Sequence, residues 1–122
     1  MQKERKVLLG NAIKIEKMKI DKTGRGFDIS EFTDRYGAKC SIQKSSLATE
    51  DAIWFGVDDP DPKIMASDAD RLGLPTNGET TGWVKYDVPR EVLINNRMHL
   101  TREQVAELLP TLQKFVETGE IS

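Results

Sequence analysis

Two short runs of alternating residues, separated by a tight turn, constrain the fold of this chain most. Residues 27–34 (FDISEFTD) and 38–45 (AKCSIQKS) alternate with a period of two, which is typical of β-strands. Between them, residues 34–37 (DRYG) begin with Asp and end with Gly, as β-turns favour. The sequence therefore predicts an antiparallel hairpin in which Cys40 faces the protein interior.

Proline and glycine divide the next part of the chain into short segments. The two prolines of residues 58–62 (DDPDP) exclude regular structure there. We expect a buried strand over residues 52–57 (AIWFGV), a short helix within 64–74, and further strands over 83–88 and 91–98.

The clearest helical signal lies at the C-terminal end. Residues 101–118 open with Thr101 and carry Gln104 three positions later, which is the capping-box pattern. Apolar residues then recur at helical spacing: Val105, Leu108, Leu109, Leu112, Phe115 and Val116. Gly119 is a favoured residue just beyond a helix end. We therefore predict an amphipathic C-terminal helix.

Residues 1–22 are ambiguous between helix and strand. Apolar spacings of three and four favour an amphipathic helix that joins subunits, although residues 13–20 (IKIEKMKI) also alternate as a strand would. We expect the helix. The predicted fold class is thus α+β: one domain over residues 1–122, with a small antiparallel β-sheet within 27–98 between an N-terminal and a C-terminal helix.

Charge and composition exclude several classes of protein. The chain has 18 basic and 20 acidic residues and a net charge of −2, yet residues 1–25 alone carry +5. One Cys and one His exclude an internal disulfide and a Cys/His zinc site built by one chain. No apolar run approaches the roughly 20 residues of a membrane span, and residues 7–9 are too short for a signal-peptide core. We expect a cytoplasmic protein that binds neither DNA nor membrane and needs no metal or cofactor.

The strongest candidate site is residues 95–102 (NNRMHLTR), directly before the capped helix. Helix N-termini and arginine side chains bind phosphate groups, while amide and imidazole groups contact bases and riboses. These properties predict a site for a nucleotide-like ligand. Its candidate residues are Asn96, Arg97, His99 and Arg102, with Arg35, Ser45 and Ser46 as second-tier candidates. The alternative is that Arg97 and Arg102 pair only with acidic groups of the protein.

Other chemistry is less well supported. Cys40 fits a buried structural thiol better than a nucleophile, and His99 fits a ligand-contacting or structural imidazole better than a general base. The acidic residues within 58–70 lack the spacing of a calcium loop and fit a solvated surface. We therefore expect a binding protein and not an enzyme.

Several segments resemble a known phage family. Residues 32–46 (FTDRYGAKCSIQKSS), 48–51 (ATED), 53–54 (IW), 98–104 (MHLTREQ) and 115–120 (FVETGE) are similar to the first-described Thoeris anti-defence family. The resemblance implies a phage protein, acting in the cytoplasm of the infected host cell, that sequesters cyclic ADP-ribose isomers such as TIR-derived gcADPR without cleaving them.

The resemblance also implies partners and site residues. It implies homo-oligomers built from dimers, up to hexamers, with ligand pockets between protomers, and a separate site for cyclic oligonucleotides in some members. Phosphate contacts are then expected from the arginines, and base or ribose contacts from the amide, the hydroxyls and the imidazole. Trp54 could stack on a base, but we expect it in the core. The alternatives are a phage inhibitor that acts by direct protein contact, which the acidic charge of residues 26–122 would suit, and a small nucleotide hydrolase that uses His99.

Overall fold

A computed structural model describes residues 8–9, 12–13 and 15–122 of the chain. The chain divides into two compact units, and each is described by itself. The first unit comprises Met1–Asp58 and Asn96–Ser122, and the second comprises Asp59–Asn95. The prediction of a single domain over residues 1–122 stays a prediction.

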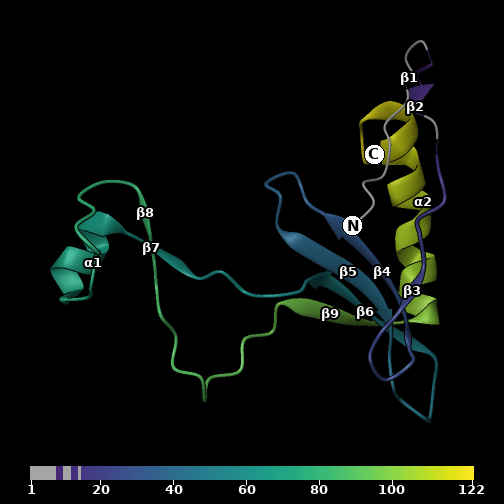
Figure 1. The fold of residues 1–122 in the computed structure, drawn as a ribbon. Helices are drawn as coiled ribbons and strands as arrows, with labels where there is room; N and C mark the ends of the chain where they lie inside the picture. Colours follow the sequence, from purple (N-terminus) through teal and green to yellow (C-terminus); the bar gives the residue numbers. More distant parts are fainter. Residues whose placement is uncertain (1–7, 10–11, 14) are drawn as a thin grey trace. The chain divides into compact units, whose positions relative to one another are not determined.

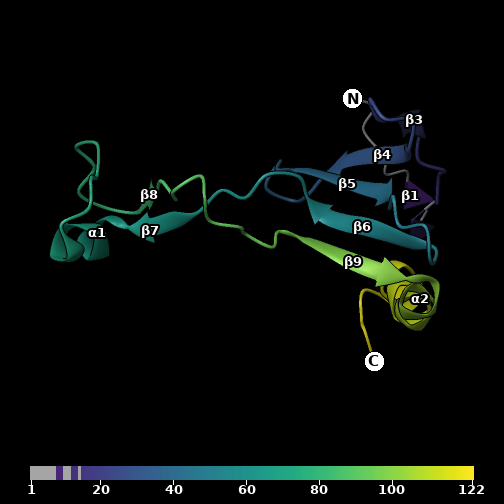
Figure 2. The same cartoon turned by 90° about the horizontal axis from the view of Figure 1, so that it is seen from below.

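The first unit is built on a five-stranded antiparallel sheet (Figures 1 and 2). Its strands, in spatial order, are β3 (Asp21–Lys22), β4 (Asp28–Thr33), β5 (Lys39–Lys44), β6 (Ala52–Val57) and β9 (Arg97–Thr101). The predicted hairpin is confirmed, because β4 pairs with β5 around the DRYG turn. Asp34 Oδ1 holds that turn by accepting hydrogen bonds from the backbone N–H groups of Tyr36 and Ala38.

The two faces of this sheet differ in chemistry. Successive residues of a strand point to opposite faces, and paired residues on neighbouring strands share one. The apolar face carries Cys40, which is 4% exposed, together with Phe32 and Phe55. The rings of Phe32 and Phe55 pack edge to face, with their centroids 6.0 Å apart. The opposite face carries the polar residues and the tryptophan of the candidate site.

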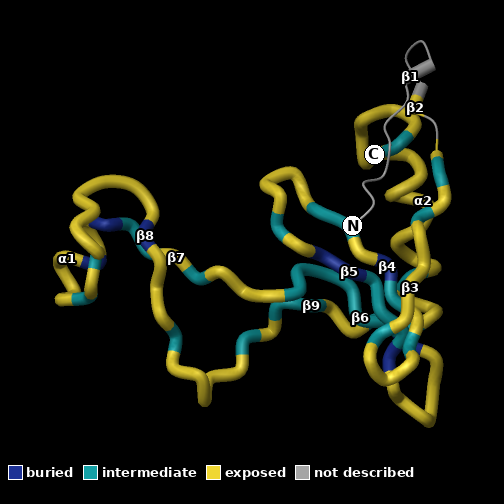
Figure 3. The backbone as a smooth tube through the Cα atoms, in the orientation of Figure 1, coloured by how far each residue is buried: buried dark blue, intermediate teal, exposed yellow. Residues whose placement is uncertain are grey.

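The predicted C-terminal helix is confirmed as α2 (Arg102–Thr118). Thr101 caps its first turn, with the reciprocal bonds to Gln104 of a capping box, and Gly119 ends it in the left-handed conformation. The helix follows β9 directly, and Figure 3 shows it exposed along most of its length. No residue of α2 is buried.

The predicted N-terminal helix is wrong. Within residues 1–22, the described residues form strand β1 (Leu8–Leu9), strand β2 (Ala12–Ile13) and β3, with no regular structure over 15–20. β1 and β2 pair antiparallel, and β3 joins the edge of the main sheet. The physical reason lies in the β-branched isoleucines, which favour extended backbone, and in pairing partners that helical periodicity does not reveal. The other residues of that range lie outside the described part of the chain.

The predicted strand over residues 91–98 is also wrong in position. Its place in the sheet is taken by β9, whose Met98 and Leu100 lie opposite Phe55 and Ile53 of β6. Residues 91–96 form no strand. The pairing with β6 decides the register of β9, and such long-range pairing is not visible in a local pattern.

The second unit lies between β6 and β9 in the chain. Strand β7 (Lys63–Met65) pairs antiparallel with β8 (Trp83–Lys85), and helix α1 (Ala66–Leu72) follows β7. Its small core consists of Ala66, Ala69 and Val84. The short helix predicted within 64–74 is thereby confirmed. In the part of the chain that the structure describes, no helix is both long and apolar enough to cross a membrane.

Candidate functional site

Strand register lines up three polar and aromatic side chains across the sheet. Gln43 of β5 lies opposite Trp54 of β6, and Trp54 lies opposite His99 of β9. The three side chains therefore form one row on the same face, perpendicular to the strands. The next row on that face pairs Gly56 with Arg97.

The aromatic rings of this row are stacked. The indole of Trp54 and the imidazole of His99 have centroids 3.9 Å apart and planes within 6° of parallel. The guanidinium of Arg97 lies over the indole, 5.3 Å from its centroid, in cation–π geometry. Arg97 Nη1 also donates to Gln43 Oε1 at 3.2 Å. We call Gln43, Trp54, Arg97 and His99 the stacked cluster.

Gly56 makes room for the arginine in this cluster. A Cβ at this position would lie 2.9 Å from the carbonyl oxygen of Asn96 and 3.6 Å from Cγ of Arg97. The φ angle of Gly56, +148°, is also one that residues with a side chain rarely adopt. The glycine therefore lets β9 approach β6 closely while Arg97 lies against Trp54.

A buried hydroxyl supports the imidazole. His99 Nε2 and Ser45 Oγ are hydrogen-bonded at 2.9 Å, and Ser45 is buried while His99 is exposed. Ser45 Oγ also accepts a hydrogen bond from the backbone N–H of Leu47 at 3.2 Å. This pairing fixes the orientation of the ring that stacks on Trp54.

Asn96 has a structural role in this arrangement. Its Nδ2 donates to the backbone carbonyls of Val57 at 2.6 Å and Asp58 at 2.9 Å. These bonds tie the end of β6 to the start of β9. The side chain of Asn96 is thus engaged with backbone beside the cluster and is not one of its members.

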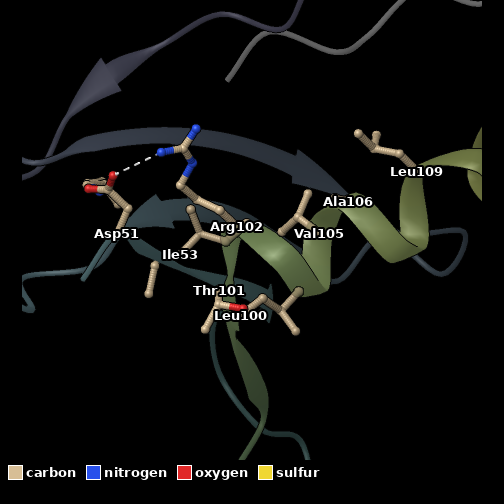
Figure 4. Close-up of a pocket in the computed structure, with 10 residues that line it drawn as sticks. Asp51, Ile53, Leu100, Thr101, Arg102, Val105, Ala106 and Leu109 are labelled. Atoms are coloured by element: carbon tan, nitrogen blue, oxygen red, sulfur yellow. Dashed lines mark hydrogen bonds and ion pairs between the residues drawn. The ribbon is translucent and has the colours of Figure 1, made fainter.

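The structure separates Arg102 from Arg97. Arg102 Nη1 lies 3.8 Å from a carboxylate oxygen of Asp51, at the rim of a cavity away from the stacked cluster (Figure 4). That cavity has a volume of about 480 Å³ and an apolar wall formed by Ile53, Leu100, Val105 and other side chains.

Asp51 is the acidic group at this rim. Lys44 Nζ donates a hydrogen bond to it at 2.7 Å, and the charges of Lys44 and Arg102 lie nearby. The hydrogen bond from Lys44 is the main cause that lowers the pKa of Asp51. The Arg102 guanidinium is therefore paired with an acidic group, which was the alternative foreseen from the sequence for this residue.

The remaining predicted residues lie outside the cluster. Arg35 is exposed in the turn between β4 and β5, and Ser46 is exposed in the loop after β5. Of the seven predicted site residues, Ser45, Arg97 and His99 come together. Gln43 was missed, because only the pairing of β5 with β6 brings it beside Trp54, and a local pattern carries no signal for that pairing.

The stacked cluster carries aromatic, amide and guanidinium groups, each of which can contact part of a nucleotide. Aromatic faces stack on bases, amides read base edges, and guanidinium groups bind phosphate. Among the described residues, no group of three or more His, Cys, Asp or Glu side chains is arranged to hold a metal ion.

No protein-family profile matches the chain, and comparisons with curated proteins and with solved structures find no significant match.

Proposed function

We propose that this chain is a phage anti-defence protein that binds and sequesters cyclic ADP-ribose isomers such as TIR-derived gcADPR, without cleaving them. The observation that carries the proposal is the stacked cluster, in which Arg97 lies over Trp54 and Trp54 stacks on His99. The sequence resemblance to the first-described Thoeris anti-defence family points to the same class of ligand. Sequestration silences the effector by removing its signal in the cytoplasm of the infected cell.

The cluster accounts for each part of such a ligand. The imidazole of His99, which is exposed and stacked on Trp54, offers a surface on which an adenine ring can stack, and the amide of Gln43 offers hydrogen bonds to a base edge. Arg97 supplies the positive charge that a pyrophosphate needs. Arg35, Ser46, Asn96 and Arg102 stand outside this arrangement, and we assign them no ligand contact.

Homo-oligomers built from dimers, up to hexamers, and a separate site for cyclic oligonucleotides belong to the same proposal. Both rest on the sequence resemblance.

Calorimetry with cyclic ADP-ribose isomers tests the proposal. We expect tight, saturable binding by the native chain, and binding weakened by about tenfold or more in Trp54→Ala and Arg97→Ala. Tyr36→Ala is the matched control, because Tyr36 is an exposed aromatic residue in the turn between β4 and β5. The absence of heat with every isomer and with cyclic oligonucleotides would overturn the proposal.

Tryptophan fluorescence locates the ligand. The chain has two tryptophans, and Trp83 belongs to the second unit. In a Trp83→Phe background the remaining emission comes from Trp54 and should change when ligand binds. In a Trp54→Phe background the emission of Trp83 should stay constant. A response from Trp83 alone would place the ligand elsewhere.

A nucleotide hydrolase is the second candidate, because one observation favours it. The Ser45–His99 hydrogen bond of 2.9 Å has the geometry of a nucleophile and its general base. Chromatography of ligand released by denaturing the complex decides between the two candidates. Intact ligand in stoichiometric amount supports sequestration, whereas progressive substrate loss that His99→Ala abolishes supports hydrolysis.

A further inference from the structure

The cavity at the start of α2 lies on the face of the sheet opposite the stacked cluster. Strand pairing places Lys44 beside Ile53 and Ile53 beside Leu100, so these three side chains form one row across β5, β6 and β9. Ile53 and Trp54 are neighbours in β6 and therefore point to opposite faces. A ligand in this cavity and a nucleotide on the stacked cluster thus occupy separate sites.

The first turns of α2 form the other wall of the cavity. Val105 and Leu109 are four positions apart, so they lie on one side of the helix, and both line the cavity together with Ile53 and Leu100 (Figure 4). Leu109 is 57% exposed although its side chain is wholly apolar. An apolar ligand that covers Leu109 removes this surface from water, which favours binding.

The size and lining of the cavity favour an apolar ligand body over a nucleotide. Its volume is about 480 Å³, within the range of about 300–1,000 Å³ that is usual for small-molecule sites. Among the described residues, those that line the cavity include no aromatic ring and no side-chain amide. Stacking on a base and hydrogen bonding to a base edge need such groups. The wall therefore suits an aliphatic chain.

The rim of the cavity carries one more positive charge than negative charge. Lys44 and Arg102 face the single carboxylate of Asp51, one at each of its oxygens. Lys44 Nζ donates a hydrogen bond to Oδ1 at 2.7 Å, whereas Arg102 Nη1 lies 3.8 Å from Oδ2, which is beyond hydrogen-bond distance. The exposed guanidinium of Arg102 can therefore donate to a second carboxylate as well.

We propose that this cavity binds an amphipathic carboxylate such as a medium-chain fatty acid. The carboxylate accepts hydrogen bonds from Arg102, and the aliphatic chain lies against the wall formed by Ile53, Leu100, Val105 and Leu109. The single negative charge of this ligand matches the one uncompensated positive charge of the rim. The nucleotide proposed above does not contact these residues, so each site can be tested without the other.

Calorimetry with sodium octanoate, below its micelle concentration, tests the headgroup. We expect saturable binding of one octanoate per chain, and binding of 1-octanol, which has the same chain without the charge, that is weaker by about tenfold or more. Arg102→Gln should weaken octanoate binding by about the same factor. Arg35→Gln is the matched control, because Arg35 is exposed in the turn between β4 and β5. Absent octanoate binding, or equal binding of octanoate and octanol, would overturn the proposal.

Asp51 provides a second test of opposite sign. Asp51→Asn removes the carboxylate that competes for Arg102, so we expect octanoate to bind several-fold more tightly. Glu50→Gln removes a neighbouring exposed charge that does not line the cavity, and it should change the affinity less. An unchanged or weaker affinity in Asp51→Asn would overturn the placement of the headgroup at this rim.

Nuclear magnetic resonance locates the aliphatic chain. On titration with octanoate, the largest changes in amide chemical shift should occur at Ile53, Leu100 and Val105. Leu112 and Phe115, which are exposed apolar residues farther along α2, serve for comparison and should change little. Changes centred on Leu112 and Phe115 would show adsorption to the exposed side of the helix and would overturn the proposal.

Discussion

The indole of Trp54 and the imidazole of His99 lie face to face, 3.9 Å apart and 6° from parallel. The two residues are 45 positions apart in the chain and meet only because β6 pairs with β9. We expect a double-mutant cycle with Trp54→Ala and His99→Ala to give a coupling energy of about 1 kcal/mol in the free energy of unfolding. Urea denaturation of the four proteins measures it. A coupling energy of zero would mean that the rings do not interact in solution.

Asn96 should matter for stability and not for ligand affinity. Asn96→Ala removes the donor to the carbonyls of Val57 and Asp58, and we expect it to lower the free energy of unfolding by about 1–3 kcal/mol. Asn95→Ala is the matched control, because the neighbouring Asn95 is exposed. Calorimetry on the folded variant should show nearly native affinity. A loss of affinity comparable to that of Arg97→Ala would make Asn96 a ligand contact.

A side chain at position 56 should lower the stability of the fold. In Gly56→Ala the new Cβ would crowd the carbonyl oxygen of Asn96 and adopt an unfavourable φ, so we expect a loss of about 1–3 kcal/mol in the free energy of unfolding. Ligand affinity should fall as well, because Arg97 must move. Gly24→Ala serves for comparison, since a Cβ there meets no atom within 4 Å. Similar unfolding curves for both variants would contradict the close packing of β6 on β9.

Cys40 should react slowly with thiol reagents. Burial is the main cause that raises the pKa of this thiol, and the charges of Asp34 and Asp58 raise it further. At pH 8 a smaller fraction of Cys40 is therefore thiolate than of an exposed cysteine. We expect Cys40 to be labelled more slowly than a cysteine introduced at the exposed position of Lys114 (Lys114→Cys). Asp58→Asn should speed the labelling of Cys40.

The same shift predicts how stability depends on pH. The folded state keeps the thiol protonated at pH values where the unfolded chain has lost the proton. The free energy of unfolding should therefore fall as the pH rises through the range in which an ordinary cysteine ionises. This contribution to the pH dependence of the free energy of unfolding should be absent in Cys40→Ala. An equal slope in both proteins would contradict a raised pKa.

Local signals in the sequence were sufficient for the elements that depend on neighbouring residues. The hairpin of β4 and β5 follows from alternation around the DRYG turn, and α2 follows from its capping box and apolar spacing. In both cases the residues that determine the structure lie within one turn or one helix. Short-range chemistry therefore predicted these parts of the fold, together with the burial of Cys40.

Only the tertiary structure decided the N-terminal strands, the place of β9 and the membership of the stacked cluster. Residues 1–22 carry patterns for both helix and strand, and β9 takes its register from β6. Gln43, Trp54 and His99 form one row through two separate strand pairings. Pairing between distant strands depends on which partner is available, and this information is not contained in any short segment. The sequence by itself determined which chemical groups the chain carries, and the sheet decided which of them meet.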